Sequence, residues 1–141
     1  MQLIKQAALC VAVLISSTAI AGEMTKSKSP DGASAYIIEP KNGATVPTTF
    51  NVIFGLKGMG VAPAGTDKEN TGHHHLLIDS KMMPPLDQPL GKETKHFGGG
   101  QTQTELTLEP GTHTLQLILG DKGHIPHDPP VVSEIITIHV K

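Results

Sequence analysis

Short apolar segments alternate with polar turn residues along most of this chain, and no long stretch repeats with the periodicity of a helix. Between positions 115 and 119, for example, every second residue is a leucine, which is the period of a half-buried strand. The runs PKNG at 40–43 and EPG at 109–111 are turn signals, because proline presets one backbone dihedral and glycine or asparagine accepts positive φ. The pattern predicts strands over 35–38, 48–55, 73–79, 103–108, 113–119 and 131–140.

Strands at this spacing predict an all-β fold, and more specifically an immunoglobulin-like antiparallel β-sandwich of about seven strands. We expect a single domain over residues 35–141. Residues 80–102 are too long a stretch for a featureless connector, so we expect them to hide a short edge strand, to carry function, or both.

The first residues have the pattern of a secretory signal peptide over 1–21. Lys5 supplies positive charge, residues 7–15 are apolar, and a small-x-small cleavage site ends at Ala21. We therefore predict cleavage near Ala21, a flexible linker over 22–34, and a periplasmic or secreted protein. The apolar run is too short for a membrane span, so we expect none in the mature chain.

Composition narrows the chemistry of the mature chain. Cleavage removes Cys10, the only cysteine, which excludes disulfides, thiolate zinc sites and the His₂Cys ligand set of blue copper. Any metal must then bind to nitrogen, oxygen or methionine sulfur. The chain has a formal net charge of −2 with its histidines neutral, and it lacks a basic stripe, which disfavours nucleic-acid binding.

Histidine is the residue type with the most distinctive distribution. All eight histidines lie in the second half of the chain, and three of them are consecutive. Neutral imidazole is the commonest protein ligand for transition metals, so a metal site is the first hypothesis. The eight are His73, His74, His75, His96, His113, His124, His127 and His139.

The immunoglobulin-like topology brings several of these histidines to one end of the sandwich. The loop before the third predicted strand and the loop after the fifth emerge at the same end. Alternation puts His73 and His75 on one face and His74 on the other, although the sequence leaves open which face carries the site. His96 joins the same rim if the long connection that contains it climbs back to that end. The predicted metal ligands are His73, His75, His96, His124 and His127.

Two histidines are predicted to lie away from this rim. His113 begins a strand at the opposite end, in a corner position where sandwiches place a side chain that hydrogen-bonds to backbone. We interpret it as structural. His139 lies between two apolar residues of the last predicted strand, and we interpret it as a surface residue.

Four motifs resemble the signature of an uncharacterised family of small exported bacterial domains. The resemblance covers about residues 50–141, which is most of the predicted domain. It implies export and a bacterial source, and it implies no activity, because no function is established for the family. The motifs are GHHHLLID at 72–79, HFGGGQT at 96–102, PGTHTLQL at 110–117 and GDKGHIPH at 120–127.

We interpret the chain as an exported, histidine-rich metal-binding protein that buffers or delivers copper(II) or zinc(II). Imidazole suits both ions, and the Irving–Williams order gives copper a slight preference. We expect about one ion per chain, and weaker binding below a pH of about 6.5, where free imidazole takes up protons.

Two other classes of function stay open. A metal-dependent hydrolase would use three histidines and an open position for water, with Glu69 or Asp121 as base or supporting group. No serine or cysteine nucleophile constellation accompanies these residues, so a protein that is not an enzyme is favoured. A non-catalytic envelope binding or structural module would contact a protein partner through residues 82–90.

Overall fold

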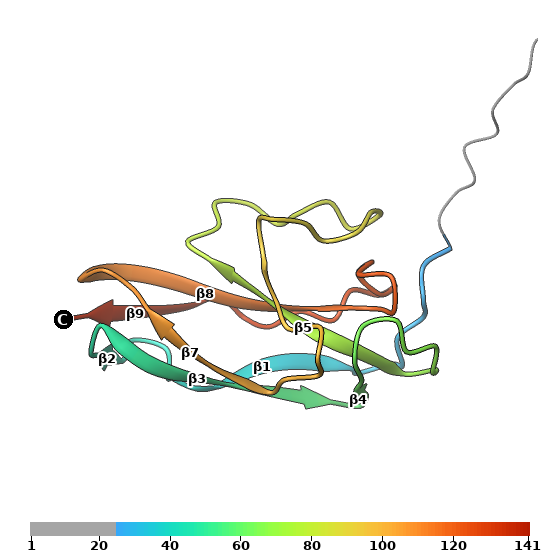
Figure 1. Ribbon diagram of the computed structural model, residues 1–141, viewed down its shortest axis with the longest axis horizontal. Coiled ribbons are helices and arrows are strands. Elements are labelled where there is room, and N and C mark those ends of the chain that lie inside the picture. The colour runs from blue at the N-terminus through green and yellow to red at the C-terminus, as the bar shows by residue number, and fades with distance from the viewer. Residues whose placement is uncertain (1–24) are drawn as a thin grey trace, which may run out of the picture.

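The computed structural model describes residues 25–141, and these form two β-sheets stacked on each other (Figure 1). One sheet has the strand order β1-β3-β7, and the other has the order β2-β9-β8-β5-β4, with β6 paired to β5. The pairs β2–β9 and β4–β5 are parallel, and the other pairs are antiparallel. The strands are β1 (Ser34–Glu39), β2 (Thr45–Val46), β3 (Thr49–Lys57), β4 (Gly60–Val61), β5 (Thr71–Ile78), β6 (Lys95–His96), β7 (Gln103–Thr107), β8 (Gly111–Gly120) and β9 (Ile136–Val140).

The hydrophobic core lies between the two sheets. Strand β3 contributes Val52 and Phe54 from one sheet, and β8 contributes Leu115 and Leu117 from the other, all of them buried. These residues occupy every second position of their strands, so each strand turns one face to the core. The apolar residues at every second position of the sequence are thus the residues that face this core.

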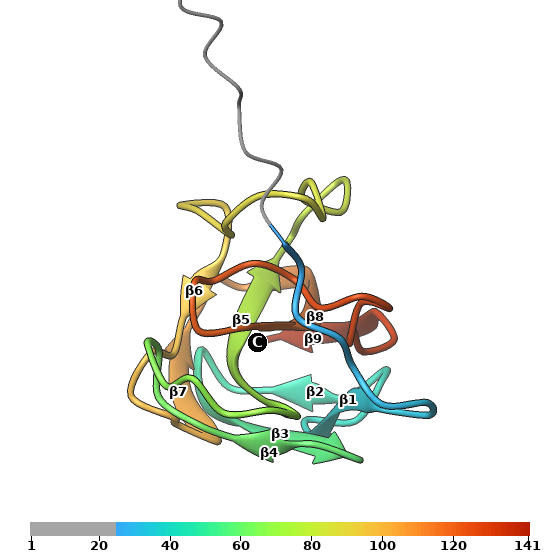
Figure 2. The same ribbon diagram turned by 90° about the vertical axis from the view of Figure 1, so that its right-hand side faces the viewer.

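The central strands β5 and β8 are also covered on their second face. Leu77 of β5 and Ile118 of β8 pack against Leu90, which belongs to the segment 80–94 on the outer side of the larger sheet (Figures 1 and 2). Six consecutive residues of β5 are therefore buried. A side chain on either face of β5 is consequently shielded from solvent.

The predicted all-β sandwich is confirmed, and its immunoglobulin-like type stays a prediction. Residues 25–141 contain nine strands instead of about seven, because β2, β4 and β6 have only two residues each and leave no periodic signal. Strand β6 is a short edge strand of the kind expected within residues 80–102. No helix in the described part of the chain is long and apolar enough to cross a membrane.

The last strand begins at Ile136 and not, as predicted, at Val131. Ser133 interrupts the ladder, because its hydroxyl oxygen accepts a hydrogen bond from the amide of Leu117 at 2.8 Å where a backbone carbonyl would otherwise accept. The amide of Ser133 donates to the carbonyl of Leu117 at 2.9 Å. A buried serine therefore ends the regular pairing of an otherwise β-branched segment.

The segment before β1 is hydrogen-bonded to the loop that follows β8. The Ser27 hydroxyl donates to Asp121 at 2.7 Å, and the Ser29 amide donates to the carbonyl of Asp128 at 3.2 Å. These residues belong to the stretch 22–34 that we expected to be a flexible linker. The predicted signal peptide lies outside the described residues.

Candidate metal centre

Strand β5 carries the three consecutive histidines and separates them onto its two faces. His74 points toward the core between the sheets, where its ring centroid lies 5.2 Å from that of Phe54. His73 and His75 share the other face, and their ring centroids are 4.8 Å apart. The outer face of the larger sheet is therefore the face on which further histidines can join this pair.

Four imidazoles gather at this face. Each offers one ring nitrogen, and the four nitrogens lie within 4.8 Å of one another. The Nε2 atom of His73 is 2.9 Å from Nδ1 of His124 and 3.1 Å from Nε2 of His75. The ring centroid of His96 lies 5.0 Å from those of His73 and His75. We call His73, His75, His96 and His124 the histidine cluster.

The loop after β8 holds His124 in a left-handed backbone conformation, with φ at 67°. Asp121 shapes this loop, because its Oδ1 accepts hydrogen bonds from the amides of Gly123 at 2.9 Å and Ile125 at 3.0 Å. Burial raises the pKa of Asp121, but these bonds and the one from the Ser27 hydroxyl outweigh burial and lower that pKa below its usual range. Asp121 is thus a carboxylate that positions His124 through the loop.

His96 reaches the cluster from strand β6, which pairs with β5 so that His96 lies opposite His75. The next residue, Phe97, is buried and donates its amide to the carbonyl of His74 at 3.1 Å. His96 itself is the exposed member of the cluster. The cluster therefore has one side that is open to solvent.

Two glycines leave the space that rings of the cluster occupy, and a third lets the backbones of β5 and β8 approach each other. A Cβ atom at Gly120 would lie 2.9 Å from Nε2 of His75, and a Cβ atom at Gly98 would lie 2.6 Å from Nε2 of His96. A Cβ atom at Gly72 would lie 2.6 Å from the carbonyl oxygen of Gly120. All three glycines belong to the sequence motifs, but their role depends on contacts between distant segments that the sequence does not reveal.

Three members of the cluster, two of them buried, are neutral at pH 7. Burial, reinforced by the neighbouring His124 and His96, lowers the pKa of His73 to about 4. Burial, reinforced by His73 and then by His96, lowers the pKa of His75 to about 3. Burial and the nearby His124 also lower the pKa of His96. These three imidazoles are thus already in the neutral form that binds a metal ion.

The Thr94 hydroxyl selects one tautomer of His75. Its oxygen lies 3.0 Å from Nδ1 of His75 and 3.1 Å from the carbonyl oxygen of Gly91, which can only accept a hydrogen bond. The hydroxyl proton therefore goes to Gly91, and the hydroxyl oxygen accepts the proton of Nδ1 of His75. The Nε2 atom of His75 then directs a lone pair into the cluster. Metal-binding histidines commonly have such a partner on their second ring nitrogen.

The cluster nitrogens are spaced closely enough for one ion. With metal–nitrogen bonds of about 2.0 to 2.1 Å, the nitrogens lie about 3.3 Å apart in a tetrahedral site and, for neighbouring ligands, about 2.9 Å apart in a square-planar site. The contacts of 2.9 and 3.1 Å at Nε2 of His73 fall close to these values. A neutral ring nitrogen holds one proton or one lone pair, so Nε2 of His73 cannot satisfy both neighbours by hydrogen bonding. A cation bound between the ring nitrogens would instead accept a lone pair from each of them.

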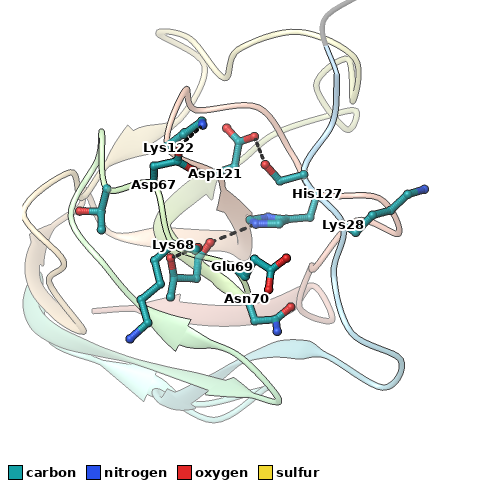
Figure 3. Close-up of a pocket in the computed structure, with 11 residues that line it drawn as sticks. Lys28, Asp67, Lys68, Glu69, Asn70, Asp121, Lys122 and His127 are labelled. Carbon is teal, nitrogen blue, oxygen red and sulfur yellow. Dashed lines mark hydrogen bonds and ion pairs between the residues drawn. The ribbon is translucent and has the colours of Figure 1, made fainter.

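His127 lies outside the histidine cluster, so four of the five histidines predicted as ligands come together. Its Nε2 donates to the carbonyl of Thr71 at 3.1 Å, and its ring lines a polar pocket of about 420 Å³ (Figure 3). Glu69 and Asp121, the acids predicted as base or supporting group, line this same pocket. Both oxygens of Asp121 already accept hydrogen bonds, which leaves it a supporting role.

The two histidines predicted to lie away from the site do so. The Nδ1 atom of His113 donates to Oδ2 of Asp79 at 2.7 Å, and its Nε2 donates to the carbonyl of Glu109 at 2.8 Å. The bond to Asp79, followed by the bond to the Glu109 carbonyl, raises the pKa of His113. The predicted backbone contact of His113 is thus confirmed, and so is the exposed position of His139.

Residues 82–90, predicted as a partner-binding segment, divide into an exposed and a packed part. Met82 is 79% exposed and Met83 is 37% exposed. Leu86 and Leu90 instead pack against Leu77 on the outer face of the larger sheet. The packed part keeps the segment over the strands that carry the cluster.

Comparison with known proteins identifies a family for this chain but gives no activity. A family model described as "Domain of unknown function (DUF4399)" matches residues 52–141, which include the whole histidine cluster. No curated protein matches the chain, and no solved structure matches it.

Proposed function

This chain belongs to that family, and because the family description states no activity, we propose a function from the histidine cluster itself. We propose that the protein binds one divalent transition-metal ion, copper(II) or zinc(II), and buffers or delivers it as cargo. The observation that carries this proposal is the approach of four imidazole nitrogens to within 4.8 Å of one another. The burial and lowered pKa values of His73 and His75 support it further, because a neutral imidazole binds a cation without first losing a proton.

Copper(II) is the favoured cargo. An all-imidazole ligand set suits both ions, and copper(II) stands above zinc(II) in the Irving–Williams order.

Hydrolysis is the second candidate, and two observations disfavour it. A catalytic metal ion keeps an open position for water, whereas four imidazoles occupy the four positions of a tetrahedral or square-planar site. A general base must also lie within hydrogen-bond reach of that water. Asp121 is engaged with backbone amides, and Glu69 lines the separate pocket beside His127.

We further propose that the protein acts in the periplasm or outside the cell, after cleavage near Ala21. The sequence pattern of residues 1–21 supports this proposal. The intact mass of protein from a periplasmic fraction tests it, with a chain that starts at Gly22 as the expected result. A chain that retains residues 1–21 in the cytoplasmic fraction would contradict it.

Calorimetric titration of tag-free protein with copper(II) and zinc(II) tests the proposed function. We expect about one ion per chain. His73→Ala and His124→Ala each remove a ligand of the cluster and should largely abolish the binding heat. His139→Ala changes an exposed histidine outside the cluster and should leave it unchanged. No heat and no rise in melting temperature with either ion would overturn the proposal.

A further inference from the structure

The four histidines of the cluster differ in how firmly they are held. His73 and His75 are fully buried on the central strand β5. His124 is half-buried, and the hydrogen bonds of Asp121 fix the loop on which it lies. His96 is exposed, and among the described residues no hydrogen bond restrains its ring nitrogens. Three ligands are thus part of the packed structure, and one is attached at its edge.

The backbone on both sides of His96 is fixed, although its side chain is free. Thr94 is buried, and its hydroxyl contacts both Nδ1 of His75 and the carbonyl of Gly91. Phe97 is buried and packs edge-on against Phe54, with ring centroids 4.8 Å apart. Rotation of the His96 side chain, which takes picoseconds to nanoseconds at an exposed position, is therefore enough to move its ring. No strand has to open.

We propose that His96 is the exchange ligand of the histidine cluster. It leaves the bound ion first, and the imidazole of a recipient takes its coordination position while His73, His75 and His124 still hold the ion. This inference rests on the proposed metal-binding function and specifies how the cargo is handed over. One metal–nitrogen bond breaks, one forms, and both imidazoles are neutral before and after, so no electron or proton changes place.

Gly98 provides a way to displace His96 without removing it. The His96 ring lies against Gly98, where a Cβ atom would come within 2.6 Å of Nε2. Gly98 does not have positive φ, so its backbone accepts alanine, and the flexible ring is the group that must move. Gly99→Ala is the matched control, since its Cβ atom would meet only the end of the exposed Gln101 side chain.

Equilibrium binding of copper(II) is the first part of the test. We expect His96→Ala and Gly98→Ala to weaken binding about tenfold, and His73→Ala to weaken it at least about a hundredfold. Gly99→Ala should bind as the wild type does. Free imidazole added to copper-loaded His96→Ala should restore the fourth nitrogen, which the nitrogen hyperfine pattern in electron paramagnetic resonance would report. The wild-type spectrum should stay unchanged at the same imidazole concentration.

The rate of copper(II) transfer to free histidine is the second part. We expect the wild-type rate to rise in proportion to the histidine concentration, and His96→Ala to transfer about tenfold faster, because the recipient then displaces only water. A His96→Ala variant that loses binding as fully as His73→Ala, or that transfers no faster than the wild type, would overturn the exchange role while leaving metal binding intact. A wild-type protein that binds no copper would instead overturn the proposed function, and the exchange role with it.

Discussion

The hydroxyl oxygen of Thr94 accepts a hydrogen bond from Nδ1 of His75 at 3.0 Å, although 19 positions separate the two residues in the sequence. This contact leaves the lone pair of Nε2 of His75 directed at the histidine cluster. Thr94 therefore positions His75 as a ligand, although Thr94 does not itself contact the ion.

Removing this hydroxyl should weaken metal binding without removing a ligand. We expect Thr94→Val to lower copper(II) affinity about 10- to 100-fold, because Nδ1 of His75 loses its partner and the tautomer is no longer selected. Thr94→Ser keeps the hydroxyl and should bind nearly as the wild type does. The ¹⁵N chemical shifts of His75 in the metal-free protein report the tautomer directly. Identical shifts in Thr94→Val would contradict this role.

Gly120→Ala should damage both stability and binding. The new Cβ atom would lie 2.9 Å from Nε2 of His75 and 3.3 Å from Cα of His124. Both of these ligands must therefore move away from Gly120. Overpacking of this kind costs about 1 to 3 kcal/mol in the free energy of unfolding, which urea denaturation measures. Gly123→Ala is the control, since its Cβ atom would lie an ordinary 3.6 Å from Asp121. Equal effects of the two substitutions would argue against a specific role for Gly120.

The metal-free protein should lose stability as the pH falls below about 6.5, the value for free imidazole. The folded-state pKa values of His73 and His75, about 4 and about 3, lie below that value, so the unfolded chain takes up protons first. Their contribution is complete above pH 6.5 and is lost progressively as the pH falls toward 4 and 3. The urea midpoint at pH 7.5 should therefore exceed that at pH 5.

His74→Leu provides the control for this pH dependence. Burial lowers the pKa of His74 to about 4, and both of its ring nitrogens are buried without a hydrogen-bond partner. The variant should depend less steeply on pH and, at pH 5, should be at least as stable as the wild type. An unchanged slope would mean that His74 titrates normally in the folded protein.

Metal binding should persist to a lower pH than the free imidazole value suggests. Protons compete with the ion for His73 and His75 only near the lowered pKa values of these two residues, about 4 and about 3. We therefore expect measurable copper(II) affinity to persist below pH 6.5 and to be lost completely only near pH 4. Calorimetry between pH 7 and 4 checks the expectation, and a complete loss of affinity by pH 5.5 would refute it.

His113→Gln should lower stability and leave copper(II) affinity unchanged. The substitution removes two hydrogen bonds at the end of β8 away from the cluster, for a cost of about 1 kcal/mol. The pKa of His113 is raised in the folded protein. The stability that His113 contributes is therefore present below its pKa in the unfolded chain and is lost as the pH rises through its pKa in the folded protein. Urea midpoints of variant and wild type should differ more at pH 6 than at pH 9. A loss of metal binding would contradict the structural role.

Ligands of one ion should be coupled in a double-mutant cycle. We expect His73→Ala and His124→Ala to be strongly non-additive in copper(II) affinity, because each substitution alone already dismantles the shared site. His127→Gln should leave the affinity nearly unchanged, since its ring contacts the Thr71 carbonyl outside the cluster. Additive effects of the first pair, or a large effect of His127→Gln, would point to separate sites.

The convergence of the cluster was predictable where it follows from strand geometry. Period-two alternation pairs His73 with His75, and the order of the strands brings the loop of His124 to the same end. His96 was predicted to join them only if the long connection climbed back, and strand β6 meets that condition by pairing with β5.

The remaining features depend on contacts that no local pattern records. His124 and His127 are three positions apart, yet the left-handed backbone at His124 sends the two rings to different places. Thr94 reaches His75 from the segment 80–94, which Leu90 packs onto the outer face of the larger sheet. Side-chain packing between distant segments decides both.

The hydrogen bond from Ser27 to Asp121 bears on how the protein should be produced for metal studies. It ties the start of the described chain to the same carboxylate that shapes the His124 loop, whereas Lys141 lies at the far end of the sandwich (Figure 1). An affinity tag fused upstream of Ser27 would disturb this hydrogen bond and, with it, the loop that carries His124. A tag without histidine, fused after Lys141, would leave both the loop and the ion undisturbed.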